Sequence, residues 1–261
     1  MKKVLFVCFA LVLFQSAFAQ KNKGITLAYN FQKGAKYIMT FGTLQDVKVM
    51  GQEMPQAMTF VISYEVLKAD KDGTAEMKLT YDRIKFSQNN PMGQIDYDSD
   101  SKSAPEGLTA MIAENFGKLV KQSLVIRMKK NGEIVDVLEG DENLKQAFKQ
   151  NKMVSTFPDK ALKVGDSWSE DTQNDTGAVK IKVSTTYTLA SIKDGKIVIE
   201  SKGILKNGEG KEMGTQSGTS TYDQNDLMLV ISAVVQDIKG MEVQGMTMDM
   251  TTKSNVSVGK K

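Results

Sequence analysis

The chain has 261 residues, of which 25% are charged, with a formal net charge of +3 and no histidine. Positive and negative residues are interspersed, so no basic face indicates binding to nucleic acid or to an anionic membrane. Without histidine the chain lacks the commonest general base and the commonest metal ligand, which excludes Ser-His-Asp and Cys-His catalytic sites.

Residues 1–19 have the pattern of a secretory signal peptide. Two lysines precede an apolar run over residues 4–14, and Ala17-Phe18-Ala19 forms a small-x-small cleavage site. The apolar run is too short to cross a bilayer as a helix, and we expect no transmembrane segment later in the chain. Cleavage would leave 242 residues with a formal charge of +1. We therefore expect an exported protein of the periplasm, or else an extracellular one.

Parts of residues 31–100 recur in residues 162–226. Three pairs of segments align: Phe31–Tyr37 with Leu162–Trp168, Tyr64–Gly73 with Thr186–Gly195, and Tyr97-Asp98 with Tyr222-Asp223. The spacing between matches drifts, as expected of a repeat that kept its strands and changed its loops. We therefore expect two divergent copies, joined by a helical connection at about 103–157, within a single β-rich domain over residues 20–261.

Alternating apolar and polar residues predict antiparallel strands in both copies. Residues 58–66 place Met58, Phe60 and Tyr64 on one face at period two, and residues 179–189 alternate in the same way. Such strands pack one face on a core and expose the other to water. Asp-Gly pairs at 72–73 and 194–195 are typical of type I′ hairpin turns.

Two helices interrupt the strands. Residues 103–120 begin with a Ser-x-x-Glu capping box and carry an apolar stripe that includes Met111 and Phe116. Asp141 is placed to cap a second, shorter helix. Near the end of the chain, residues 227–235 are almost continuously apolar, which predicts a strand covered on both faces. Residues 241–258 alternate again, with Met246 and Met248 on one face.

Methionine is abundant, with 16 residues. Thioethers suit Cu(I), but histidine or cysteine usually completes such sites. Flexible thioethers also line irregular apolar cores and cavities, which is the interpretation we favour over copper. The segment Asp96–Asp100 begins like a calcium loop but lacks the glycine and glutamate that an EF-hand requires at positions 101 and 107. We therefore expect no metal and no cofactor.

Catalytic motifs are not evident in the sequence. The carboxylates show no spacing that singles out a pair for hydrolysis. Neither a dinucleotide-binding glycine motif nor a phosphate-binding loop occurs. We therefore expect a protein that is not an enzyme and has no catalytic residues.

Four short segments resemble a family of exported bacterial proteins of unknown function. They are Pro158–Trp168, which contains Lys-Val-Gly-Asp-Ser-Trp, together with Lys33–Tyr37, Ile95–Ser99 and the Asn131-Gly132 hairpin that ends at Gly140. The resemblance covers most of the mature chain, and it implies no activity and no catalytic residues. The layout of many strands with a helix midway is also loosely similar to the half-barrel of periplasmic lipoprotein carriers, in architecture only.

The sequence as a whole predicts a mainly β (α+β) protein. We expect a strongly curved antiparallel sheet or partial barrel, with one or two helices on its concave side, because large twisted sheets curl or close to protect their edges. A curved sheet with an apolar lining is suited to bind a lipid or other apolar ligand. The residues that we expect to line such a cavity are Met58, Phe60, Tyr64, Met111, Phe116, Met246 and Met248.

Two functions stay open at this point. The first is a non-catalytic periplasmic binding or carrier protein for a lipid or other apolar small molecule. The second is a structural or protein-interaction module of the cell envelope, in which the same residues fill a solid core and the partner is another envelope protein. A cavity of ligand size would favour the first, and a continuously packed core or an exposed apolar patch would favour the second.

Overall fold

The computed structural model describes residues 24–90, 93–150, 155–175, 180–243 and 245–261. The predicted signal peptide lies outside these residues. Two helices and twelve strands are described. The strands are β1 (Lys36–Val49), β2 (Gln52–Ala69), β3 (Ala75–Asn90), β4 (Gly93–Asp98), β5 (Ser123–Met128), β6 (Ile134–Glu139), β7 (Ser167–Asp175), β8 (Lys180–Lys193), β9 (Lys196–Asn207), β10 (Glu212–Asp223), β11 (Leu229–Val243) and β12 (Met246–Lys260).

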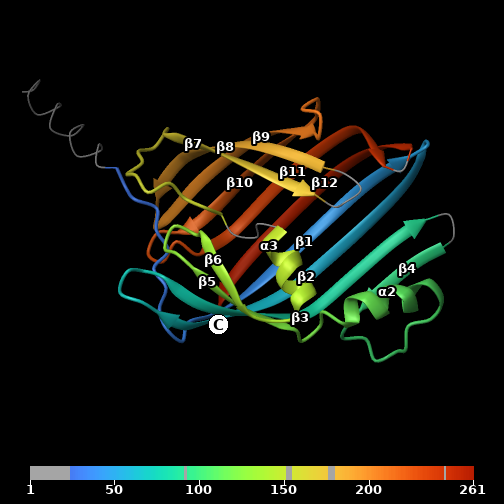
Figure 1. The fold of residues 1–261 in the computed structure, drawn as a ribbon, viewed down its shortest axis with the longest axis horizontal. Coiled ribbons are helices and arrows are strands. Elements are labelled where there is room, and N and C mark those ends of the chain that lie inside the picture. The colour runs from blue at the N-terminus through green and yellow to red at the C-terminus, as the bar shows by residue number, and fades with distance from the viewer. Residues whose placement is uncertain (1–23, 91–92, 151–154, 176–179, 244) are drawn as a thin grey trace, which may run out of the picture.

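All twelve strands belong to one antiparallel sheet. Their order is β6-β5-β3-β2-β1-β12-β11-β10-β9-β8-β7, and β4 also pairs with β3. The first and last strands therefore meet in the middle, with a continuous register from Tyr37–Lys260 to Val49–Met248. Figure 1 shows the two halves of the sheet curving toward each other. The prediction of a mainly β protein with a strongly curved antiparallel sheet is confirmed.

The first three strands of each half follow the same plan. Consecutive antiparallel pairs join β1, β2 and β3 in one half and β7, β8 and β9 in the other. Before each half, a glycine has a positive φ, 83° at Gly34 and 96° at Gly165. Each donates its N–H to the carbonyl near the end of the second strand, Val66 or Leu189, at 2.8 Å. These features support two copies, whose limits at 31–100 and 162–226 stay a prediction.

The third sequence match does not join equivalent positions. Tyr97 pairs with Phe86 in the second half of β3, whereas Tyr222 pairs with Ile197 at the start of β9. Both β4 and β5 pair with β3, along opposite halves of it, so together they stand beside β3 as β10 stands beside β9. In the first half, the segment that contains the first described helix therefore separates the two strands, β4 and β5, that take the place of the single strand β10. The alignment of Tyr97-Asp98 with Tyr222-Asp223 was wrong.

Helix α2 (Gly107–Gly117) lies beside β4 at one end of the sheet (Figure 1). It begins after the predicted capping box, and Glu106 at its N-cap forms no side-chain hydrogen bond to the helix. Its Phe116 ring packs against Phe86 and Tyr97, with centroids 5.8 and 6.1 Å away. These two strand residues share the concave face, so α2 covers only a rim of that face.

Helix α3 (Glu142–Gln150) lies between the two halves of the curved sheet (Figure 1). The prediction of its N-cap is confirmed, because the Asp141 carboxylate accepts hydrogen bonds from the backbone N–H groups of Asn143 at 3.0 Å and Leu144 at 3.2 Å. This cap fixes where the chain turns from β6 into the helix. No described helix is long and apolar enough to cross a membrane.

The concave face holds two apolar clusters. The larger one includes Tyr37, Ile62 and Leu189, and the smaller one is formed by Val183, Leu205, Ile238 and Met241. The convex face is exposed even where the sequence is most apolar. On β11, Ile231 is 54% exposed and Val235 is 37% exposed. The prediction of a strand covered on both faces was therefore wrong, since only its concave face is buried.

Candidate functional site

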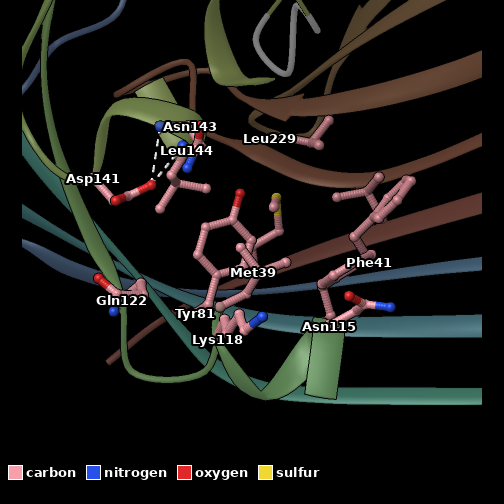
Figure 2. Close-up of a pocket in the computed structure, with 13 residues that line it drawn as sticks. Met39, Phe41, Tyr81, Asn115, Lys118, Gln122, Asp141, Asn143, Leu144 and Leu229 are labelled. Atoms are coloured by element: carbon pink, nitrogen blue, oxygen red, sulfur yellow. Dashed lines mark hydrogen bonds between the residues drawn. The ribbon is translucent and has the colours of Figure 1, made fainter. Parts of the chain in front are cut away.

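A cavity of about 980 Å³ opens on the concave side of the sheet, between the sheet and the two helices. Figure 2 shows its lining, with strand residues on one side and the ends of α2 and α3 on the others. The lining residues are Met39, Phe41, Phe60, Tyr81, Asn115, Lys118, Leu119, Gln122, Asp141, Asn143, Leu144, Leu229 and Val256.

Strand alternation gives the cavity its apolar floor. Met39 and Phe41 on β1 point to the concave side, and register places Phe41 opposite Phe60 on β2 and Val256 on β12. The Phe41 and Phe60 rings stack with centroids 6.2 Å apart, and Phe60 meets Tyr81 edge-on at 6.2 Å. Such aromatic pairs add to the stabilisation that burial of the rings provides. The floor is therefore an apolar surface of mutually packed rings.

The polar side chains of the cavity come from its rim. Asn115 and Lys118 lie at the end of α2, and Asp141 and Asn143 lie at the start of α3 (Figure 2). The carboxylate of Asp141 is occupied as the helix cap described above. Lys118 forms a surface pair with Glu114 at 3.6 Å, with both side chains more than 70% exposed. Charge is thus confined to the entrance.

The tyrosines in and behind the floor carry no charge at neutral pH. Burial raises the pKa of Tyr81, which lines the cavity. Burial also raises the pKa of Tyr64, whose hydroxyl donates to the Met39 sulfur at 3.1 Å. A buried phenolate would lose hydration without gaining a partner, which disfavours the charged form. The cavity floor is therefore uncharged.

Four of the predicted residues lie on or against the concave face. Phe60 lines the cavity. Tyr64 is buried behind the floor against Met39. Met58 is half-buried and pairs with Phe86, two residues before Phe60 on β2. Phe116, which belongs to α2, packs against the same Phe86. Of these four, only Phe60 is among the lining residues, and contact with a ligand stays a prediction for all of them.

The other three predicted residues lie away from the cavity. Met111 is 65% exposed, because α2 packs on the sheet through Phe116 and Met111 does not share that contact. Met246 is 41% exposed at the start of β12. Met248 packs against the smaller cluster. None of the three is among the residues that line this cavity, so their contact with a ligand stays a prediction. Period-two and helical patterns show which face a residue shares but not what covers it.

Several lining residues were missed by the sequence analysis. Met39 and Phe41 belong to an alternating segment, and Leu119 belongs to the apolar stripe of 103–120, so a signal existed for these three. Leu229 lies in the apolar run 227–235 and Val256 in the alternating segment 241–258, but neither pattern shows that pairing between β1, β11 and β12 brings both residues to the cavity. Within the described residues, no group of three or more acidic, histidine or cysteine side chains is placed to hold a metal ion.

Residues 72–152 and 138–259 match the model of a protein family described as "Family of unknown function (DUF6263)". Together the two segments cover more than half of the chain. The chain belongs to this family. A match in two segments suggests two copies, although the matched ranges of this DUF6263 protein differ from those of the predicted copies. A search of curated proteins found no match.

Among solved structures, the DUF6263 chain is similar to lipovitellin, with a TM-score of 0.51 and 10% identity over 89% of the chain. It spans only 26% of the lipovitellin chain, and at this identity the likeness shows the fold alone. A candidate lipoprotein from Parabacteroides distasonis matches over 90% of this chain and 99% of its own, at 11% identity and a TM-score of 0.31. An outer membrane channel from Pseudomonas putida F1 matches over 89% of this chain and 98% of its own, at 8% identity and a TM-score of 0.34. TM-scores this low do not establish a shared fold with either protein.

Proposed function

We propose that this protein is a non-catalytic binding or carrier protein that holds a lipid or another apolar ligand in the concave cavity. The observation that carries the proposal is the cavity itself. Its volume of about 980 Å³ lies at the upper end of the range typical of small-molecule sites, roughly 300–1,000 Å³. Its floor is apolar and its polar residues are at the rim, which is the arrangement that an apolar ligand requires.

The likeness to lipovitellin supports the same proposal. That structure was described for its lipid–protein interactions, and it shares the fold of this chain over nearly the whole described length. Because a fold does not establish a function, the likeness adds to the cavity and does not replace it.

The chemistry of the lining supports binding rather than catalysis. Among the described lining residues, Asp141 is the one carboxylate, and it is engaged as a helix cap. General acid–base or nucleophilic catalysis needs paired groups with matched pKa values in reach of one another. We therefore propose that the cavity stores or transfers its ligand unchanged. With the signal-like N-terminus, the proposed location is the periplasm.

A cavity-filling variant tests the proposal. Val256→Trp places an indole in the cavity, and Asn255→Trp places the same side chain on the exposed convex face of β12 as a matched control. With the fluorescent fatty acid 11-(dansylamino)undecanoic acid as the probe, wild type and Asn255→Trp should bind equally. Val256→Trp should bind at least about tenfold more weakly.

Two results would contradict the proposal. One is unchanged binding by Val256→Trp, which would place the probe elsewhere on the protein. The other is failure of wild type to bind any apolar probe, which would favour the interaction module of the cell envelope. Circular dichroism of each variant shows that it is folded.

A further inference from the structure

A line of uncharged polar side chains crosses the concave face. We call it the polar row. Successive strand pairings place its members side by side across β2, β1, β12, β11, β10 and β8, with Gly203 of β9 between the last two. The members are Gln56, Gln45, Thr252, Gln236, Gln216 and Thr185.

The row is connected by side-chain hydrogen bonds. On one side, Gln56 donates to the Gln45 carbonyl, and Gln45 donates to the Thr252 hydroxyl at 3.3 Å. On the other side, Gln236 donates to the Gln216 carbonyl at 2.8 Å, and Gln216 donates to the Thr185 hydroxyl at 3.1 Å. The amides are thereby aligned along the direction that crosses the strands.

The glycine in the row has a specific role. A Cβ at Gly203 would lie 3.1 Å from the Gln216 side chain and 3.1 Å from the Thr185 hydroxyl. Those contacts are tight, so the absence of a side chain on β9 is what lets Gln216 reach across to β8. The polar row therefore crosses β9 at Gly203, where the Gln216 side chain spans the strand to reach Thr185.

The polar row separates two apolar regions of the same face. Gln45 lies four residues beyond Phe41 on β1, which is about 13 Å along a strand from the cavity floor. Two residues farther along their strands, Ile238 and Val183 belong to the smaller apolar cluster. A polar line within an apolar face is costly unless its groups are hydrogen-bonded.

The internal bonds leave hydrogen-bonding capacity. An amide offers two N–H donors and a carbonyl with two lone pairs. Among the described residues, each of the four glutamines donates one side-chain hydrogen bond, so each keeps a second N–H. The glutamines are half-buried rather than enclosed, so part of each side chain is accessible to a ligand on the concave side.

From this placement we infer that the ligand is amphipathic and uncharged at its polar end. Its apolar chain occupies the cavity, and its ester, amide or hydroxyl group bonds to the amides of the polar row. The inference rests on the function proposed above. It goes further by assigning a second subsite and a class of ligand.

The lack of charge in the row decides the class of polar group. None of its members carries a charge, so an anionic head group bonded to them would lose its hydration without gaining a cation from the row. Amides that both donate and accept match esters, amides and hydroxyls instead. A neutral acylglycerol should therefore bind better than the fatty acid with the same chain.

Calorimetric titration with glycerol monolaurate and with laurate, both below the concentration at which they form micelles, tests the inference. Wild type should prefer glycerol monolaurate by about tenfold, as two hydrogen bonds of ordinary strength would give. Gln45→Leu combined with Gln236→Leu should lose this preference and still bind laurate. Asn255→Leu, on the convex face, is the matched control and should keep the preference.

The outcomes separate the two proposals. Equal affinities in wild type, or a preference that survives in the double variant, would overturn the role of the polar row and leave the cavity as the apolar site. Failure of wild type to bind either compound would overturn both. If the double variant does not fold, Gln236→Met, which keeps the side-chain length, is used in its place, and the preference of wild type is informative without any variant.

Discussion

Among single residues, Tyr37 joins the two halves of the chain through a side-chain hydrogen bond. Its hydroxyl lies 3.2 Å from the Asp226 carboxylate in the turn between β10 and β11. Burial, followed by the negative charge of Asp226, raises the pKa of Tyr37 to about 12. The neutral phenol is therefore part of the folded structure.

This pKa predicts how stability changes in alkali. A group whose pKa is raised in the folded state stabilises the protein fully below its unfolded pKa, about 10 for tyrosine. That contribution is lost as the pH rises from about 10 through about 12. We expect urea unfolding to show a steeper loss of stability over this range in wild type than in Tyr37→Phe. Wild type and Tyr37→Phe compared at pH 8 serve as the control. If the free energy of unfolding falls in parallel with pH in the two proteins, the prediction is contradicted.

Single residues were predicted from the sequence only where their own strand decided their position. Phe60 shares the concave face because period-two alternation requires it, and the structure places it in the cavity. Met111 and Met246 followed equally regular patterns but are exposed. What covers a face is determined by elements distant in sequence, which a local pattern does not contain.

Among elements, the β5–β6 hairpin depends on Gly132. Its φ of +90° lies in the left-handed region, where residues with a Cβ are strained. A Cβ at this position would also overlap the backbone carbonyl oxygen of Ser155. The glycine therefore permits both the turn and the close approach of residues 155–157, where Phe157 donates its N–H to Asn131 at 2.8 Å.

Two glycine variants separate strain from overlap. Gly34 also has a positive φ, 83°, but open space surrounds the position of its missing Cβ. Gly34→Ala should cost about 1–2 kcal/mol of unfolding free energy through backbone strain alone. Gly132→Ala should cost about 1–3 kcal/mol more, because a packed backbone must move. Equal losses in urea unfolding would show that Ser155 adjusts freely.

Local chemistry predicted some elements correctly and not others. The Asp141 cap and the Asp194-Gly195 turn are as expected, with φ of 52° and 71° at the two turn residues. At Asp72-Gly73 only the glycine has a positive φ, so that turn is not of the predicted I′ type. The N-terminus of α2 was also misplaced. The helix begins at Gly107, after the predicted capping box that starts at Ser103, and no described side chain caps it.

For the whole molecule, the pairing of β1 with β12 is the decisive contact. It joins the two halves along a continuous register. An internal repeat predicts the hairpins of each copy, since these are local. It does not predict which strands of different copies become neighbours, because that depends on contacts across the entire chain. Fold class was therefore accessible from the sequence, and strand order was not.

The joined sheet predicts a single cooperative unfolding transition. Trp168 on β7 is the only tryptophan, so its fluorescence reports on the second half. In a Trp168→Phe, Phe60→Trp variant the indole reports on the first half. In each of the two proteins, the unfolding midpoint measured by tryptophan fluorescence should equal the midpoint measured by far-UV circular dichroism. Separate midpoints would show that the halves are independent domains.

Native mass spectrometry of the protein purified from the periplasm of cells that export it, followed by organic extraction, tests the central claim most directly. An apolar ligand in the concave cavity predicts a mass excess that extracts as a lipid or other apolar compound and is reduced in Val256→Trp. A bare polypeptide mass that stays unchanged after incubation with envelope lipids would contradict the claim.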